Sequence, residues 1–168
     1  CCGLHTDFNG LMVDKIELQI VDSVILPNLK MQGAEEACAY LDGRGRCSIH
    51  PYRPGICRLF PLGRYYENGG FSYFLQTGEC AKENRSKIKV SKWIDTPDLT
   101  RNQQFTLQWH DLLHAMEERL TGEDEGKQRE ENLLLLRLFY LLPYEGTIDF
   151  YTQFTERMEH WNGQNGQI

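Results

Sequence analysis

The chain has 168 residues, of which 40% are hydrophobic and 25% charged, and these proportions are typical of a globular protein. A chain of this length forms one domain, or one domain with a helical extension, and can bury a core without metal or disulfides. The net charge of -6 argues against a general nucleic-acid binder, and no apolar run approaches the roughly 20 residues that cross a bilayer.

Six cysteines are present, and the chain starts with Cys1 instead of methionine. We expect the natural chain to begin upstream of Cys1, and the short join after Gly3 leaves room for a second gap. No secretory segment is visible, and the composition indicates a bacterial, cytoplasmic protein. In a reducing cytosol, clustered cysteines are more often metal ligands or catalytic groups than disulfides. Disulfide bonding, or burial of the thiols as small apolar side chains, are the alternatives left open.

Residues 15–31 are expected to form a β-hairpin. Apolar and polar side chains alternate from Ile16 to Ile20, which is the period of a strand. The turn is expected at Val21-Asp22-Ser23, and a β-rich run resumes before Pro27.

Glycines and prolines punctuate residues 33–63, so regular structure longer than a turn or two is not expected there. A segment this rich in loops needs something else to order it, and a metal held by several cysteines would do so. Aromatic residues within 64–76 flank Glu67-Asn68-Gly69-Gly70. Because Asn-Gly supplies the positive φ of a tight turn, this stretch predicts a second hairpin.

Apolar side chains at helical spacing predict three C-terminal helices, over residues 102–120, 127–142 and 147–161. We expect the leucines of 133–142 to face inward. The sequence thus predicts an α+β fold. A cysteine-bearing domain, residues 1–92, carries the two hairpins and packs with a helical region, residues 93–168, as one compact unit. A protein partner would bind through the C-terminal helices.

Four cysteines lie in a window of 43 residues, separated by 8, 9 and 22 residues: Cys38, Cys47, Cys57 and Cys80. This spacing matches neither the paired CxxC of zinc ribbons nor the CxxCxxC run of bacterial ferredoxins, so it does not identify a metal. Because the four lie in turn-rich chain and not on apolar faces, we predict that they bind one. Cys1 and Cys2 are adjacent, and neighbouring side chains of an extended chain point to opposite sides. They suit two metal centres, or one ligand and one nearby thiol.

Two arginines, Arg53 and Arg58, lie among these cysteines. Cationic neighbours lower the pKa of a thiol and offset the charge of a thiolate-bound metal. They also suit the carboxylate or phosphate of a cofactor or substrate. Pairing with Asp42, Glu79 or backbone carbonyls is the structural alternative.

Histidines offer further candidates. The imidazole of His50 has the chemistry of a metal ligand, but its position between Ile49 and Pro51 gives no geometric support for that role. His110 and His114 are spaced i, i+4, a spacing that can bind metal on one helix face, although the HExxH pattern is absent. Ordinary amphipathic packing gives the same spacing.

The chain resembles the YkgJ-like cysteine-cluster family, also described as a CxxCxxCC zinc- or iron-chelating domain. The matching elements are Cys38-Ala39-Tyr40-Leu41-Asp42, Cys47-Ser48-Ile49-His50, Arg53-Pro54 and Cys57-Arg58-Leu59-Phe60-Pro61. Cys80 fits a later cysteine of the family, and the resemblance covers residues 1 to about 92. The family pattern has two more cysteines before its Cys-Cys pair and usually a tyrosine at the position of His50. The resemblance therefore implies about eight cysteines in the intact protein, enough for two four-ligand sites.

The resemblance implies a bacterial metal-binding protein, and three functions follow. The first is an iron–sulfur centre with a redox or cluster-dependent role, since soft thiolates without a clear histidine partner suit such clusters. The second is a structural zinc module that binds a protein partner. The third is a lysine N-methylase dependent on S-adenosylmethionine, like a related branch that modifies flagellin. Neither a GxGxxG loop nor a CxxxCxxC run is present to support it.

Overall fold

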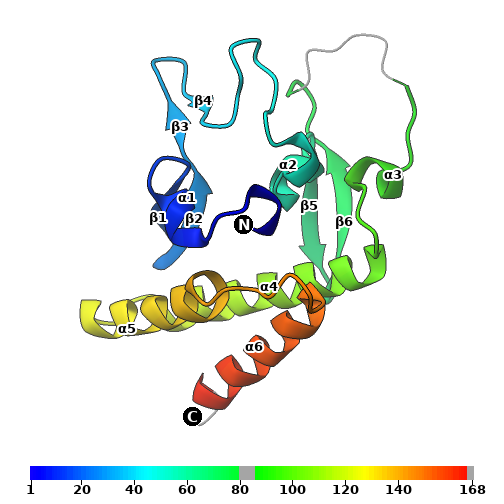
Figure 1. The fold of residues 1–168 in the computed structure, drawn as a ribbon. Helices are drawn as coiled ribbons and strands as arrows, with labels where there is room; N and C mark the ends of the chain where they lie inside the picture. Colours follow the sequence, from blue (N-terminus) through cyan, green and yellow to red (C-terminus); the bar gives the residue numbers. More distant parts are fainter. Residues whose placement is uncertain (80–85, 166–168) are drawn as a thin grey trace. The chain divides into compact units, whose positions relative to one another are not determined.

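The computed structural model describes residues 1–79 and 86–165, apart from the side chains of Cys2 and Asn165. These residues form an α+β fold, as predicted, with helices and two-stranded antiparallel sheets (Figure 1). Two compact units are present: unit 1 comprises Cys1–His50 and Leu112–Ile168, and unit 2 comprises Pro51–Asp111. The domain boundary predicted near residue 92 stays a prediction.

Unit 1 holds the N-terminal elements and the last helices. Its first elements are the 3-10 helix η1 (Cys2–Leu4), α1 (Phe8–Met12), β1 (Ile16–Val21), β2 (Val24–Leu29), β3 (Met31–Gln32) and β4 (Ala37–Cys38). Its last are the end of α4 (Leu99–Leu120), α5 (Glu125–Leu136), the π-helix η3 (Arg137–Leu141) and α6 (Phe150–Asn165). None of the described helices has the length and apolar character that crossing a membrane requires.

The first hairpin is confirmed. β1 and β2 pair antiparallel from Ile16 opposite Leu29 to Val21 opposite Val24. Asp22 and Ser23 make the turn with φ of 48° and 67°. Two successive residues with positive φ match the right-handed twist of the strands that they join.

Asn132 of α5 fastens this hairpin to the C-terminal helices. Its Oδ1 accepts the Ile25 N–H at 2.7 Å, and its Nδ2 donates to the Ser23 carbonyl at 2.9 Å and to the Gln128 carbonyl at 2.8 Å. The side chain is buried, at 3% exposure. A buried amide with this set of partners fixes the hairpin on α5 in one orientation.

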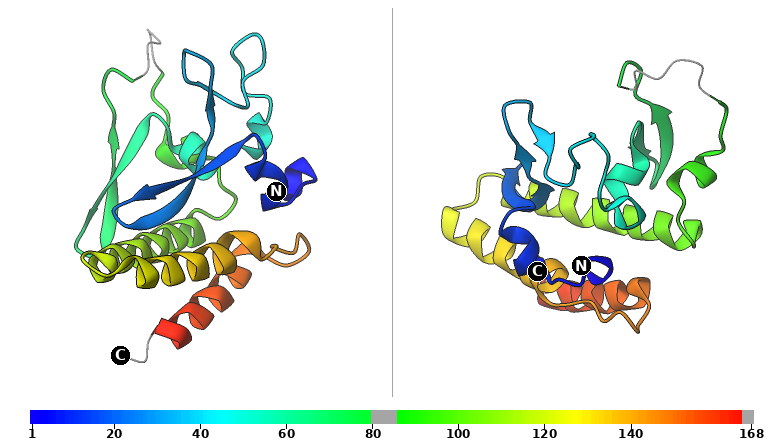
Figure 2. Two further views of the ribbon diagram at one scale, coloured as in Figure 1. Left: turned by 90° about the vertical axis from the view of Figure 1, so that its left-hand side faces the viewer. Right: turned by 45° about the horizontal axis from the view of Figure 1, so that its top comes forward.

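The end of α4 and α5 run side by side in unit 1 (Figure 2). An ion pair between Arg119 and Glu131 joins them. The buried apolar side chains on the helices of this unit are Leu112, Met116, Leu120, Leu135, Leu136, Leu138, Phe139, Phe154 and Trp161. The inward placement expected for all leucines of 133–142 is therefore wrong for Leu133, Leu141 and Leu142, whose exposures are 52%, 42% and 50%.

The helix predicted over residues 127–142 changes from an α-helix to a π-helix before it ends. α5 stops at Leu136, and the chain continues as a π-helix to Leu141, closed by the Leu142 N–H donating to the Arg137 carbonyl at 2.9 Å. The buried Arg157 of α6 then donates to the carbonyls of Leu138, Leu142 and Pro143. A guanidinium thus satisfies carbonyls that have no partner within the helix.

Unit 2 contains the second hairpin and short helices. Its elements are the end of the 3-10 helix η2 (His50–Tyr52), α2 (Gly55–Leu59), β5 (Leu62–Glu67), β6 (Gly70–Leu75), α3 (Val90–Ile94) and the first turns of α4. The hairpin prediction is confirmed, with Asn68 and Gly69 at φ of 50° and 69° in its turn. On one face, the Arg64 guanidinium lies 5.3 Å from the centre of the Phe71 ring. Residues 33–63 contain only short elements, as expected.

Substitution of Asn132 tests the anchor between α5 and the first hairpin. We expect Asn132→Ala to lower the free energy of unfolding by about 3 kcal/mol, because it leaves the Ile25 amide and the Ser23 carbonyl without their partner. The matched control is Asn28→Ala, which removes only a local bond to the Leu26 carbonyl and should cost less than about 1 kcal/mol. Chemical denaturation measures both. Equal losses in the two variants would contradict the role given to Asn132.

Candidate metal centre

The predicted ligands Cys38 and Cys47 belong to one short loop of unit 1, residues 38–48, here called the 38–48 loop. Cys38 pairs with Met31 across strands β3 and β4, and its carbonyl accepts the Leu41 N–H at 2.9 Å. Leu41 in turn forms a β-bridge with Cys47. The two cysteines thus lie at either side of a loop that backbone pairing closes.

Tyr40 holds the end of the 38–48 loop. Its carbonyl accepts both the N–H and the hydroxyl of Ser48, each at 2.8 Å. The Tyr40 side chain is buried, and burial raises the pKa of its hydroxyl, with smaller contributions from the negative charges of Asp14 and Cys38. Ser48, the residue after Cys47, is therefore hydrogen-bonded to Tyr40. Ala39, the residue after Cys38, directly precedes Tyr40 in the chain.

Asp42 orders the tip of the 38–48 loop. Its Oδ1 accepts the backbone N–H groups of Arg44 and Arg46, each at 2.9 Å, and its own N–H donates to the Arg46 carbonyl at 2.8 Å. The hydrogen bonds from these amides lower the pKa of the Asp42 carboxyl. The Arg46 amide contributes most, and the Arg44 amide contributes next. Gly45 takes φ of 72°, which the turn requires and a side chain would resist. Contacts of the protein itself therefore order this loop.

The thiols of unit 1 are accessible to different degrees. Cys38 and Cys47 are half-buried and Cys1 is exposed, and none of these three forms a disulfide. These thiols are therefore partly accessible, and metal binding and its alternative, burial as small apolar side chains, both stay predictions.

Cys57 lies in unit 2, on the short helix α2, and is half-buried. The neighbouring Arg58 donates to the Pro51 carbonyl at 3.0 Å and to the Asp95 carbonyl at 2.9 Å, and its guanidinium lies 3.6 Å from the Asp95 carboxylate. Arg58 therefore has the backbone carbonyl partners that were expected if its role is structural. Arg53 is half-buried. Cofactor binding by the two arginines stays a prediction.

The described residues bring together only part of the predicted ligand set. Cys38 and Cys47 share one loop, Cys1 lies in the N-terminal segment of the same unit, and Cys57 lies in unit 2. The Cys2 side chain and all of Cys80 fall outside the described residues. Among residues 1–79 and 86–165, no three His, Cys, Asp or Glu side chains gather as a metal site would require. The six-cysteine ligand set therefore stays a prediction.

The predicted histidine candidates have other surroundings. His50 is exposed at the start of η2. The His110 ring stacks on Tyr66, with 3.6 Å between ring centres. His114 lies 3.7 Å from Glu117 and 3.8 Å from Glu118. Packing and surface contacts therefore account for the i, i+4 spacing.

Sequence reasoning missed Lys15, which precedes β1. Its Nζ donates to the Ala39 carbonyl at 3.3 Å and lies 5.6 Å from the centre of the Tyr40 ring. This places an ammonium beside the two residues that follow Cys38. No spacing rule could indicate it, because Lys15 and Ala39 are 24 residues apart.

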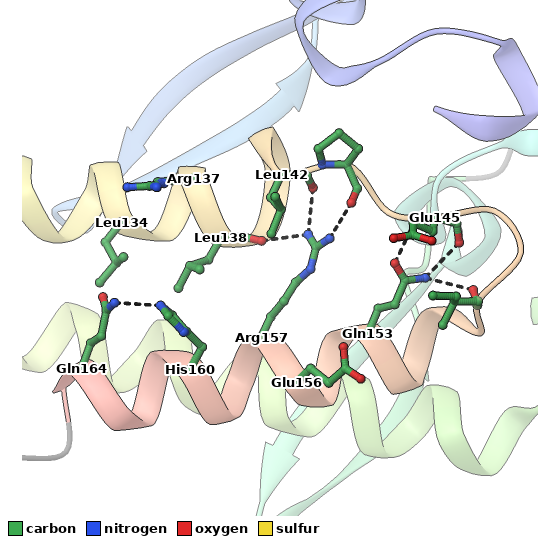
Figure 3. Close-up of a pocket in the computed structure, with 12 residues that line it drawn as sticks. Leu134, Arg137, Leu138, Leu142, Glu145, Gln153, Glu156, Arg157, His160 and Gln164 are labelled. Carbon is green, nitrogen blue, oxygen red and sulfur yellow. Dashed lines mark hydrogen bonds between the residues drawn. The ribbon is translucent and has the colours of Figure 1, made fainter.

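A groove of about 680 Å³ lies between the α5–η3 segment and α6 (Figure 3). Leu134, Leu138 and Leu142 line one wall, while His160 and Gln164 lie on α6 opposite. The polar groups buried in it are already bonded: Gln153, for example, binds the backbone of Glu145 and Ile148.

Comparison with known families gives one result that bears on the cysteines. A family model described as "CxxCxxCC: Putative zinc- or iron-chelating domain" matches residues 1–91, which is more than half of the chain. No curated protein and no solved structure matches. The match includes the 38–48 loop and Cys57, and it ends before α4 begins.

The Asp42 turn predicts a pH dependence of the 38–48 loop. Because folding lowers the pKa of Asp42, the turn is stabilised above the ordinary value of 3.8 and loses this contribution as the pH falls through the lower value in the folded protein. We expect the Arg44 and Arg46 amide signals in NMR spectra to titrate together below pH 3.8. Asp42→Asn, which keeps an acceptor oxygen, should abolish this titration, and Asp42→Ala should also speed hydrogen exchange of both amides. A midpoint above 3.8 would contradict the role of Asp42.

Proposed function

This chain belongs to the CxxCxxCC family of zinc- or iron-chelating domains, and we propose that its metal is an iron–sulfur centre with a redox or cluster-dependent role. The observation that carries the proposal is the 38–48 loop, which lies inside the family match. It presents two half-buried thiols from a backbone that is paired within the protein. Ordering a loop before its ligands bind lowers the entropy lost on binding.

The proposed ligands are the six cysteines: Cys1, Cys2, Cys38, Cys47, Cys57 and Cys80. Their chemistry fits the metal, because soft thiolates bind zinc, ferrous iron and iron–sulfur clusters in preference to hard cations. When bound, an iron–sulfur cluster would supply one-electron transfer. We place this cluster first because a ligand set of thiolates without a clear histidine partner suits iron–sulfur clusters as well as zinc. His50 is exposed, and the family resemblance places tyrosine there.

Arg53 and Arg58 support a thiolate-rich centre in this proposal. A site made only of thiolates accumulates negative charge, and a nearby guanidinium offsets it. Arg58 donates two N–H groups to the carbonyls of Pro51 and Asp95, which orients the side chain, and its one carboxylate neighbour among the described ion pairs, Asp95, is exposed to solvent. We expect such thiols to stay reduced and available to metal in a compartment like the cytoplasm.

A structural zinc module is the second candidate. The family description includes zinc. The groove beside α6, with the half-exposed Leu142 and Ile148 at its wall, is where we propose that a partner protein would contact the C-terminal helices. The lysine N-methylase alternative rests on resemblance alone, so it is not proposed.

Metal analysis of protein purified without oxygen distinguishes the candidates. We expect iron and acid-labile sulfide in equal amounts, together with visible absorption. Cys38→Ser and Cys47→Ser should each lower metal affinity by more than about tenfold, since even a residue that only orients a ligand contributes that much. His50→Ala, a change beside the same loop, is the matched control and should retain the metal.

Each other outcome is informative. A colourless protein with stoichiometric zinc would establish the zinc module in place of the cluster. Wild-type protein that takes up neither metal, or serine variants that bind as tightly as the wild type, would overturn metal binding at the 38–48 loop.

A further inference from the structure

Lys15 occupies a central position in unit 1. Its backbone carbonyl accepts the Lys30 N–H at 2.9 Å, which extends the β1–β2 ladder by one pair toward β3. Its ammonium leaves this end of the hairpin and donates to the Ala39 carbonyl, with the Asp14 carboxylate 3.0 Å away. The Lys15 side chain is 30% exposed, so water competes only partly for these contacts.

The segment that Lys15 contacts, Ala39 and Tyr40, follows Cys38 in the chain and is hydrogen-bonded to the residue after Cys47. Ala39 follows Cys38 directly and donates its own N–H to the Lys30 carbonyl at 3.0 Å. Tyr40, whose ring lies under the ammonium, accepts two bonds from Ser48, the residue after Cys47. A displacement of Ala39 or Tyr40 would therefore move both cysteines.

The hairpin that carries Lys15 has a fixed support. At its far end, the buried amide of Asn132 binds the turn at Ser23 and the following strand β2 at Ile25. A continuous set of hydrogen bonds thus runs from α5 through the hairpin to the 38–48 loop. α5 lies outside the family match, which ends at residue 91.

From these contacts we propose that Lys15 is a positioning residue for the metal-binding thiols Cys38 and Cys47. This inference rests on the proposed function. Lys15 does not ligate the metal. It holds Ala39 and Tyr40 against the hairpin, so that both thiols leave the 38–48 loop in a fixed direction, and it places a cation near a centre that gathers thiolate charge. Preorganised ligands lose less conformational freedom when they bind.

The experiment compares three variants of the full chain. Lys15→Met removes the ammonium and keeps the aliphatic side chain, whereas Lys15→Arg restores a cationic donor. The matched control is Lys127→Met, which breaks the ion pair between Lys127 on α5 and Glu123 in the turn before it, far from the cysteines in the chain. Hydrogen exchange of metal-free protein reports on the loop, and the rate of zinc or iron transfer to a chelator reports on the ligands.

We expect Lys15→Met to speed exchange of the Leu41 and Ser48 amides and metal transfer by about tenfold, the equivalent of one hydrogen bond from a charged donor. Lys15→Arg should stay within about threefold of the wild type, since it retains charge and donors. Lys127→Met should change neither rate.

Two results would overturn the inference: Lys15→Met behaving like Lys127→Met, or faster exchange in Lys15→Met with an unchanged rate of metal transfer. The second result would leave Lys15 a purely structural role. If the wild type took up no metal, the proposed function would fail, and positioning of metal ligands with it. Exchange in the metal-free protein would still decide whether Lys15 holds the loop.

Discussion

The amide of Asn132 is the contact on which the arrangement of unit 1 depends. It joins α5 to a turn more than 100 residues earlier in the chain, and it accepts and donates at the same time. Two residues of that turn hold positive φ without being glycine, which costs free energy that a specific tertiary contact can offset. Because an amide distinguishes its oxygen from its nitrogen, it accepts one orientation of the hairpin, whereas apolar packing alone would tolerate several. β3, β4 and the 38–48 loop continue from the hairpin set in this way.

The 38–48 loop shows how contacts within the protein can order a segment that contains glycines. Backbone pairing of Leu41 with Cys47, the Asp42 turn and the bonds to the Tyr40 carbonyl satisfy its polar groups. The expectation that a metal held by several cysteines helps to order residues 33–63 stays a prediction beside these contacts. In the proposed centre, contacts that order the loop on folding would leave less conformational entropy to be lost when the thiols bind metal.

Local features of the fold could be predicted from sequence, and features that depend on distant residues could not. Asn68-Gly69 and Asp22-Ser23 identify their turns because positive φ is a property of one or two residues. The π-helix that ends α5 could not be predicted, because its carbonyls depend on Arg157 in another helix. The exposure of Leu133, Leu141 and Leu142 also depends on which helix faces meet. α1 and α3 have five residues each, too few for a periodic pattern to emerge.

The candidate site also combines features that could be predicted from the sequence with features that depend on distant residues. The candidate cysteines could be named from the sequence because thiol chemistry and motif order are properties of the sequence, whereas the carbonyl partners of the neighbouring cations depend on the fold. Lys15 binds the Ala39 carbonyl and Arg58 binds those of Pro51 and Asp95, so each cation orders the chain beside a cysteine. Each also has a carboxylate neighbour, Asp14 or Asp95, that is more than half exposed and therefore screened by solvent. A carbonyl leaves the positive charge intact and water weakens the carboxylate, so in the proposed centre both cations would offset thiolate charge while they order the chain beside the predicted ligands.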